Sequence, residues 1–284
     1  GEPLIGGFTR STGLVVGGAR REFVKPVLYS AGLGRIDDRH VYKHLAKPGM
    51  LIVQIGGPAY PIGLSGGSAA SVVSGTSDVE LDFQSVQRGD AQTENRVNRV
   101  IQACAELGDD NPIESIHDQG AGGSSNVLTE LMEPAGGRID IRKITVGDRT
   151  MSVLKIWVCE YQERYGLLVW EYNLPLLQSI CERERVNCEV LGKITGDGMV
   201  VVEDSADGTT PVDLSLADVL SHMPRKRFDS QHLPVAHTPL AIPPSLTASE
   251  ALQKVFALPS GGSKGFLVRK GDRSVTGLVA RQQC

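Results

Sequence analysis

The sequence predicts an α/β fold with a mixed sheet, because short apolar runs alternate with segments of helical spacing. Apolar or β-branched runs bounded by turn residues indicate strands at 50–55, 112–117, 166–170, 189–194 and 199–203. Over 93–107, apolar residues recur every three or four positions, which is typical of one face of a helix. Strands and helices interleave from 50 to 204, and this segment is therefore predicted to form one α/β unit.

Local signals place the remaining elements. Asn173 followed by Pro175 predicts the start of a helix, and a short helix is expected over 126–132 after a glycine cluster. Thr247 and Glu250 form a capping-box pattern before a further helix. The proline-rich stretch 205–244 is interpreted as an irregular connection, and 265–280 as two strands.

Composition excludes several classes of function. The 284 residues include 29 basic and 33 acidic side chains, a net charge of −4, and only 5% aromatic residues. This balance lacks the positive charge and the stacking rings of a nucleic-acid-binding protein. No apolar run approaches the roughly 18 residues that cross a bilayer, and five scattered cysteines without a CxxC pair favour a reducing compartment. We therefore expect a cytoplasmic protein that binds neither nucleic acid nor membrane.

The region richest in glycine follows the apolar run at 50–55. Its glycines occupy positions 56, 57, 63, 66, 67 and 75. Such a backbone can turn sharply and present N–H groups to an anion. It matches neither the Walker A loop nor the dinucleotide-binding fingerprint. Two interpretations stay open, a ligand-binding loop and a tight connection that packs against a neighbouring backbone.

A second glycine loop follows Asp118. The segment 116–123 (IHDQGAGG) is expected to end a strand at Asp118 and to lead into a helix near Ser124 or Ser125. A carboxylate at the tip of a strand, beside a helix N-terminus, can hold a Mg²⁺ ion that bridges to phosphate oxygens. A helix cap is the alternative, but Asp118 precedes the glycines and is too early for it. His117 is interpreted as a packed or hydrogen-bonded side chain.

Charged and amide side chains are concentrated at 160–164, between an expected strand around 156–158 and the run at 166–170. In a continuous strand, Glu160, Gln162 and Arg164 would share one face. Such a row could bind a polar ligand. The alternative is an edge strand whose charges are solvated.

The segment 85–90 leads into the helix predicted at 93–107. Gln87 and Arg88 could meet a substrate there. Asp90 or Thr93 is suited to cap the helix, and Glu94 is favourable near the positive end of the helix dipole. From spacing alone, the cap is the simpler interpretation.

Six segments together form a specific pattern over nearly the whole chain. They are 56–71 (GGPAYPIGLSGGSAAS), 82–90 (DFQSVQRGD), 94–104 (ENRVNRVIQAC), 111–131 (NPIESIHDQGAGGSSNVLTEL), 156–164 (IWVCEYQER) and 272–284 (DRSVTGLVARQQC). In order and spacing the pattern resembles the phosphoribosylformylglycinamidine synthase family, in its large multidomain form. Only 205–244 matches loosely. The resemblance implies the C-terminal α/β domain of the aminoimidazole-ribonucleotide-synthetase-like superfamily.

The resemblance implies an ATP-dependent carbon–nitrogen ligase of purine biosynthesis. Such enzymes use ATP and Mg²⁺ to activate the formamide oxygen of formylglycinamide ribonucleotide as an iminophosphate. Ammonia released from glutamine in a separate glutaminase domain then displaces phosphate and gives the amidine. No glutaminase Cys–His–Glu set is visible in this sequence, so the fragment alone is not expected to perform the whole reaction.

The resemblance also implies roles for individual residues. Asp118 matches the family's Mg²⁺ aspartate. The residues that match substrate-binding positions are Gln87, Glu160, Tyr161 and Gln162. The residues that match a turn lining the nucleotide are Gly6, Gly7 and Phe8. Lys155 departs from the family, which usually has an acidic residue there, and no catalytic residue is assigned.

Four parts follow from the same resemblance. The segment 1–36 would end a first ATPase-type N-terminal domain, and 37–225 would be the C-terminal α/β domain of the first half. The segment 226–264 would be a linker and helix, and 265–284 the first strands of the second half. Two other hypotheses are a catalytically silent large homologue that acts as an interaction scaffold, and a smaller phosphotransfer relative such as aminoimidazole ribonucleotide synthetase.

Overall fold

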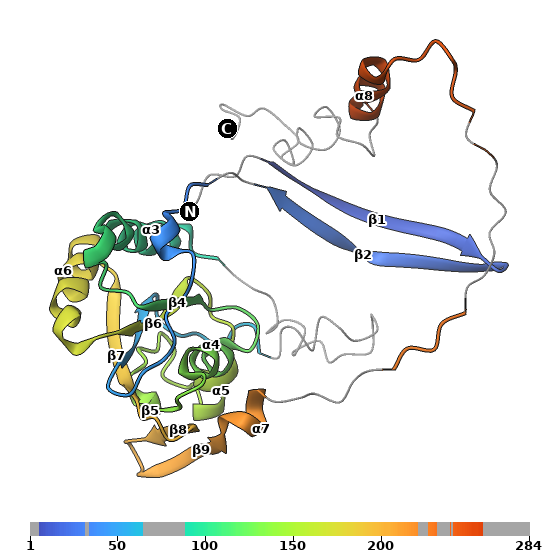
Figure 1. Ribbon diagram of the computed structural model, residues 1–284. Helices are drawn as coiled ribbons and strands as arrows, with labels where there is room; N and C mark the ends of the chain where they lie inside the picture. Colours follow the sequence, from blue (N-terminus) through green and yellow to red (C-terminus); the bar gives the residue numbers. More distant parts are fainter. Residues whose placement is uncertain are drawn as a thin grey trace, which may run out of the picture. The chain divides into compact units, whose positions relative to one another are not determined.

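The chain is described here by a computed structural model (Figure 1), in which residues 6–31, 34–64, 89–220, 227–231, 239 and 241–257 are placed. It divides into two compact units. One contains Ile36–Arg225 and is called the α/β unit below. The other contains Pro3–Arg35 and Lys226–Cys284 and is called the hairpin unit.

A mixed sheet of seven strands forms the centre of the α/β unit, in the order β4-β6-β3-β7-β5-β8-β9. Neighbouring strands are antiparallel except β5 and β8, which are parallel. The strands are β3 (Leu51–Gly56), β4 (Ser115–Asp118), β5 (Gly137–Asp140), β6 (Arg164–Val169), β7 (Asn187–Ile194), β8 (Met199–Asp204) and β9 (Thr209–Ser215). The predicted α/β fold with a mixed sheet is therefore confirmed.

Helices cover both faces of this sheet. Figure 1 shows α3 (Ala91–Glu106) and α6 (Leu174–Glu184) on one side, and α4 (Gly123–Met132) and α5 (Val153–Val158) on the other. Among the described residues of this unit, the other helical elements are η1 (Asp38–His40), η2 (Gly108–Asp110), η3 (Ile141–Lys143), η4 (Glu171–Asn173) and α7 (Leu216–Leu220). The domain therefore has three layers, helix–sheet–helix.

The position of β3 in the centre of the domain explains why its sequence is apolar at nearly every position. All six of its residues are buried, because helices cover both of its faces. Leu51, Val53 and Ile55 pack with α3 and α6, whereas Ile52 packs with α4 and α5. Gln54 is the one polar side chain of this strand and is also completely buried.

The part of the hairpin unit that the structure describes contains two long strands and a helix. The strands β1 (Gly6–Val16) and β2 (Ala19–Ala31) are antiparallel, and α8 (Ala248–Ala257) lies later in the chain. Gly17 and Gly18 connect the strands with φ of 58° and 76°, and two successive positive φ angles are typical of a type I′ hairpin turn. The sequence analysis did not predict this hairpin, although a Gly-Gly pair directly after Val15 and Val16 signals one.

Three predicted helix starts are confirmed. Asn173 and Pro175 stand at the start of α6. At α8, the Thr247 hydroxyl and backbone N–H both donate to Glu250 Oε2, at 2.9 and 3.0 Å, which is the expected capping box. Asp90 caps α3, as described below.

Three expectations about secondary structure were wrong. The run at 156–158 lies in the helix α5 and not in a strand, because Ser152 caps this helix by accepting a hydrogen bond from the Lys155 N–H at 3.3 Å. The stretch 205–244 is not wholly irregular, since it contains β9 and α7. The first residues of the predicted strand 112–117 precede β4, which begins at Ser115. The strands expected at 265–280 lie outside the described residues.

Asp90 supplies the N-cap of α3, and its removal should cost a measurable part of the stability. One carboxylate oxygen accepts hydrogen bonds from the N–H groups of Gln92 (3.0 Å) and Thr93 (3.1 Å). These bonds hold the pKa of Asp90 below its ordinary value, the Thr93 N–H being the largest cause. We expect Asp90→Ala to lower the free energy of unfolding by about 1 kcal/mol at pH 7.

The pH dependence of this loss has a defined sign. A lowered pKa in the folded state gives stability that is present above the pKa of the unfolded chain and is lost as the pH falls through the folded value. The difference between Asp90→Ala and wild type should therefore shrink in acid, as measured by urea denaturation at pH 7 and pH 3. Asp213→Ala, which removes an exposed carboxylate in β9, serves as the control. A loss that is equal at both pH values would contradict the capping role of the charged carboxylate.

Candidate functional site

Strand register brings three separate segments of the chain to one end of the sheet. Gly56, the last residue of β3, pairs with Arg164, the first residue of β6. Asp118, the last residue of β4, pairs with Tyr165. The segments 57–64, 119–123 and 159–163 adjoin these strand ends and are called the loop cluster below. The sequence reasoning singled out all three segments separately, and the fold explains why they meet.

Backbone hydrogen bonds connect the three segments of the loop cluster. The Glu160 N–H donates to the Ile62 carbonyl at 3.0 Å. The Gly57 N–H donates to the Glu163 carbonyl at 3.2 Å, and the Gln119 N–H donates to the Arg164 carbonyl at 2.9 Å. The cluster is therefore held by its own backbone as well as by the strands behind it.

Two glycines allow the closest approaches within the cluster. Gly63 has φ of 68°, and a Cβ atom there would lie 2.5 Å from the Cβ of Glu160. Gly123 has φ of 59°, and a Cβ atom would lie 2.1 Å from the Cys159 carbonyl oxygen. Both positions combine a left-handed backbone with a contact that leaves no room for a side chain. For Gly63, tight packing against a neighbouring backbone is thus the observed role, while 66, 67 and 75 lie outside the described residues.

Asp118 is exposed at the end of β4, immediately before the second glycine loop. Its side chain is 77% accessible to solvent. The helix α4 is capped by Gly122, which has φ of 83°, and not by a side chain. Asp118 is therefore free of any capping role, as its position in the sequence suggested. In the part of the chain that is described, no group of three or more His, Cys, Asp or Glu side chains could hold a metal ion.

The single Asp118 carboxylate fits Mg²⁺ when phosphate oxygens and water supply the other ligands. Mg²⁺ keeps several waters and is commonly bound through one or two carboxylates together with the phosphates of a substrate. Asp118 offers one exposed carboxylate beside a glycine loop and the N-terminus of α4. It could thus hold the ion jointly with phosphate oxygens, whereas a cage made only of protein ligands is not present among the described residues.

His117 has the structural role that the sequence suggested. Its Nδ1 lies 2.8 Å from the Asp118 carbonyl oxygen, and its Nε2 lies 2.5 Å from Glu130 Oε2. The other carboxylate oxygen of Glu130 accepts from Asn126 Nδ2 at 3.0 Å. These contacts connect the end of β4 to α4, and the interpretation of His117 as a hydrogen-bonded side chain is confirmed.

The segment 160–164 is not a strand in which alternate side chains share a face. Of these residues, only Arg164 belongs to β6, and Glu163 has φ of 57°, which interrupts an extended backbone. The alternative of a solvated edge strand is also wrong, because β6 lies between β4 and β3. Glu160 is 2% exposed and accepts a hydrogen bond from the Gly122 N–H at 3.2 Å. Gln162 is half-buried.

Tyr161 is buried beneath the loop cluster. Its side chain is 1% exposed, and its hydroxyl donates to the Ile156 carbonyl at 2.7 Å and lies 3.0 Å from Ser124 Oγ. Burial raises the pKa of this hydroxyl. The Tyr161 side chain thus packs under the loop cluster and supports it. Direct contact of Tyr161 with a substrate stays a prediction.

A set of buried polar side chains underlies the site, and the sequence reasoning did not predict that they form one cluster. Its members are Gln54, Gln119, Ser124, Tyr161, Arg164 and Glu189, and it is called the buried polar cluster below. Gln54 Nε2 donates to Gln119 Oε1 at 3.1 Å and to Ser124 Oγ at 3.2 Å. The one available signal was a glutamine inside the otherwise apolar run at 50–55, because a buried amide requires partners.

Glu163, in the loop cluster, has a carboxyl group whose pKa is shifted from its ordinary value. Desolvation raises its pKa, and the carboxylates of Glu94 and Asp90 contribute in the same direction. The nearby Tyr165 hydroxyl donates to Glu94 Oε1 at 3.0 Å. The left-handed φ of Glu163 and its raised pKa mark this turn as a position where the chain tolerates an unfavourable arrangement.

Two buried cysteines, Cys159 and Cys104, are not activated nucleophiles. Burial raises the pKa of the Cys159 thiol to about 11, although it adjoins Glu160 in the loop cluster. Burial likewise raises the pKa of Cys104 on α3 to about 12. Because the thiolate is the reactive form, neither group is suited to covalent chemistry at neutral pH.

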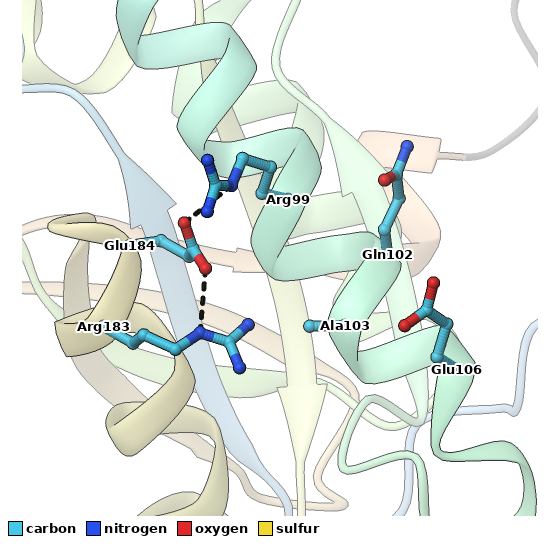
Figure 2. Close-up of a pocket in the computed structure, with 6 residues that line it drawn as sticks. All are labelled: Arg99, Gln102, Ala103, Glu106, Arg183 and Glu184. Carbon is cyan, nitrogen blue, oxygen red and sulfur yellow. Dashed lines mark hydrogen bonds and ion pairs between the residues drawn. The ribbon is translucent and has the colours of Figure 1, made fainter.

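A polar pocket of about 300 Å³ lies between α3 and α6, on the opposite face of the sheet from α4 and α5. It is lined by Arg99, Gln102, Ala103, Glu106, Arg183 and Glu184. Figure 2 shows the two guanidinium groups on either side of Glu184. Each donates from Nε to a different oxygen of that buried carboxylate, at 2.8 Å. The positive and negative side chains of this pocket largely neutralise one another, so it does not have the charge of an anion site.

Several predicted site residues do not belong to the three segments of the loop cluster. Gln87 lies outside the described residues. Gly6, Gly7 and Phe8 lie in β1 of the hairpin unit, where Gly7 pairs with Ser30 and Phe8 with Tyr29. Of the predicted set, the structure therefore gathers Asp118, Glu160, Tyr161 and Gln162. Among the described residues, no helix has the length and apolar character needed to cross a membrane.

Taken together, fold and site define a three-layer α/β protein whose glycine turns and one exposed carboxylate gather at the end of a mixed sheet. Residues 47–205 match the family "AIR synthase related protein, C-terminal domain". The chain belongs to this family, and the expected superfamily is confirmed.

Curated relatives match the chain over its whole length. "Probable phosphoribosylformylglycinamidine synthase, chloroplastic/mitochondrial" from Arabidopsis thaliana is 50% identical over 295 residues. The phosphoribosylformylglycinamidine synthases of Dictyostelium discoideum and Homo sapiens are each 46% identical, over 295 and 301 residues. The chain spans 21% of the Arabidopsis protein and 22% of each of the other two. The resemblance to this family is confirmed, and it concerns about one fifth of these larger proteins.

Solved structures share the fold at low sequence identity. "T. maritima PurL complexed with FGAR" has a TM-score of 0.59 and 22% identity, and covers 77% of this chain and 33% of that one. "T. maritima PurL complexed with ATP" has a TM-score of 0.56 and 16% identity, and covers 81% of this chain and 34% of that one. At this level of identity, the similarity shows the fold alone.

Proposed function

We propose that this chain is part of an ATP-dependent carbon–nitrogen ligase of purine biosynthesis. The ligase converts formylglycinamide ribonucleotide, glutamine and ATP to formylglycinamidine ribonucleotide. The observation that carries the proposal is the match of the whole chain, at 46–50% identity, to named phosphoribosylformylglycinamidine synthases. The solved relatives with the same fold include one complexed with FGAR and one complexed with ATP, which is consistent with the same substrates.

The chemistry requires the formamide oxygen to become a leaving group. ATP phosphorylates this oxygen to give an iminophosphate, and ammonia then displaces phosphate at the same carbon. In this proposal the ammonia comes from glutamine in a glutaminase domain of the same longer protein. Bound Mg²⁺ would neutralise negative charge on the phosphates.

The loop cluster supplies the groups that this chain contributes. Asp118 would hold the metal ion together with phosphate oxygens, because its carboxylate is exposed beside the N-terminus of α4. Glu160 and Gln162 would contact the ribonucleotide, and Tyr161 is proposed for the same substrate on the family resemblance, while its buried hydroxyl supports the segment. Gln87 is proposed for the same substrate, and Gly6, Gly7 and Phe8 for the nucleotide, on the family resemblance alone.

The four-part domain organisation is proposed on the same basis. The boundaries are 1–36, 37–225, 226–264 and 265–284. A compact unit at Ile36–Arg225 and a family match over 47–205 support the second of these parts. A cytoplasmic location stays a prediction, because the Arabidopsis relative is described as chloroplastic/mitochondrial.

The proposal is tested on the intact protein that carries this chain. We expect ADP release from ATP to depend on both formylglycinamide ribonucleotide and an ammonia source, with the amidine product identified by mass spectrometry. Release of ADP without any dependence on the ribonucleotide would contradict the proposal.

Binding separates the remaining alternatives. An intact, folded protein that binds neither ATP nor the ribonucleotide in calorimetry would favour the scaffold hypothesis. An intact mass close to that of this chain, 30.4 kDa, would instead favour a smaller phosphotransfer relative.

A further inference from the structure

We propose that Arg164 is a positioning residue, which fixes the loop cluster through a buried ion pair with Glu189. The inference deepens the proposed function and rests on it, because Glu160 and Gln162 are assigned there to the ribonucleotide. Arg164 itself is not placed in contact with a substrate. Its role follows from the segments that its guanidinium and backbone hold together.

The ion pair is almost completely removed from water. The Arg164 side chain is 0% exposed and that of Glu189 is 8% exposed, and Arg164 Nη2 lies 2.5 Å from Glu189 Oε2. The second oxygen of Glu189 accepts from the Thr145 N–H at 3.1 Å. A buried ion pair contributes little net stability compared with well-packed apolar residues of the same size. Its presence at the end of the sheet is therefore weak evidence for a role in stability alone.

Arg164 contacts all three segments of the loop cluster. Its Nη1 donates to the Gly57 carbonyl in the first segment. Its backbone carbonyl accepts from the Gln119 N–H, at 2.9 Å, in the second segment. Its guanidinium lies over the Tyr161 ring, 5.5 Å from the centroid, in the third segment. The buried guanidinium thus joins the first and third segments directly, while the Arg164 backbone contacts the second.

The buried polar cluster transmits this arrangement to the predicted substrate residues. Arg164 Nη2 donates to Gln54 Oε1 at 3.1 Å, and Gln54 Nε2 donates to Gln119 Oε1 at 3.1 Å. Gln119 Nε2 in turn donates to the Tyr161 carbonyl at 2.9 Å. Tyr161 stands between Glu160 and Gln162, so its carbonyl fixes the backbone that carries both.

Side chains add to the few backbone hydrogen bonds here, because the segment 159–163 is not part of a strand ladder. The segment 159–163 lies before β6, and Glu163 breaks the extended conformation with φ of 57°. A guanidinium has five donors in a rigid plane and can hold several acceptors at once, whereas an ammonium is a point charge on a flexible stem. Lysine at this position is therefore expected to restore the charge but only part of the positioning.

The test compares variants of the intact protein. In Arg164→Met, which keeps an apolar body, we expect the KM for the ribonucleotide to rise and kcat/KM to fall by about 100-fold, as for misplaced groups in an active site. Arg164→Lys should recover part of this loss, and Glu189→Gln should resemble Arg164→Met in direction. The matched control is Arg138→Met, which removes an exposed ion pair with Glu203, also at 2.5 Å, and should leave KM unchanged.

A purely structural role gives a different result. If Arg164→Met only lowers the folded fraction, kcat per total protein falls while KM stays at the wild-type value, and the proposal is overturned. If Arg164→Met does not fold, Glu189→Gln is judged by the same criterion.

A second measurement does not need the proposed function. Amide exchange followed by mass spectrometry should become faster together in 57–64, 119–123 and 159–163 of Arg164→Met, and not in Arg138→Met. Exchange that is unchanged in these three segments overturns the positioning role, even if wild type does not use the ribonucleotide. Absence of ribonucleotide turnover in wild type, combined with faster exchange in the variant, instead refutes the proposed function and leaves the positioning supported.

Discussion

Asp118→Asn is expected to reduce the ATP-dependent turnover of the intact protein by at least about 100-fold, because the amide cannot offer a metal ion the negative charge of a carboxylate. The same variant should barely change stability. Its side chain is 77% exposed, and the distance to its nearest ionic neighbour, His117 Nδ1, is 3.6 Å. ADP release measured against Mg²⁺ concentration, with unfolding followed separately, checks both expectations.

The control for this experiment is Asp148→Asn. Asp148 is a half-buried aspartate whose carboxylate accepts local hydrogen bonds from the Thr150 N–H and hydroxyl, at 2.8 and 2.7 Å. It should leave turnover unchanged. If Asp118→Asn keeps the wild-type rate and the wild-type Mg²⁺ dependence, Asp118 is not the metal ligand. Loss of activity in both variants would point instead to a general effect of removing surface charge.

Gly123→Ala is expected to give the largest loss of stability among single substitutions in the loop cluster. A side chain at φ of 59° costs about 1–2 kcal/mol, and forced crowding adds about 1–3 kcal/mol. The added Cβ would meet the Cys159 carbonyl oxygen at 2.1 Å, and this atom belongs to a backbone that cannot rotate away. The free energy of unfolding, measured by urea denaturation, should therefore fall by about 2–5 kcal/mol.

Gly120→Ala in the same loop is the matched control. No atom lies within 4 Å of the Cβ that this substitution adds, and Gly120 does not have the left-handed φ that makes a side chain unfavourable. It should change the stability little. Equal losses in the two variants would show that flexibility of the loop as a whole matters, and not the close approach at Gly123.

The sequence was sufficient to predict most of the sheet and its helices. Runs such as 50–55 and 199–203 lie in strands whose burial fits their apolar character, and the caps at Asp90 and Thr247 follow directly from residue type. The failure at 156–158 has a physical cause, because a short apolar run of β-branched and aromatic residues suits a strand or a buried helix equally. Ser152, four residues earlier, decides between them.

The site was only partly predictable for a related reason. Asp118 could be found because a carboxylate before a glycine loop is a local signal. The ion pair of Arg164 with Glu189 and the hydrogen bonds of Gln54 connect residues from different strands, and their partners are set by register. Neither spacing nor composition carries that information.

The two faces of β3 have different roles in the domain. Leu51, Val53 and Ile55 face a purely apolar layer, so exchanges among aliphatic residues there should be absorbed by repacking. Gln54, in the same strand, faces the other way and belongs to the support of the loops. Substitutions on the α3 and α6 side of the sheet can therefore change the free energy of unfolding while the α4 and α5 side keeps the residues that support the site. Such a domain can change its stability without changing its site.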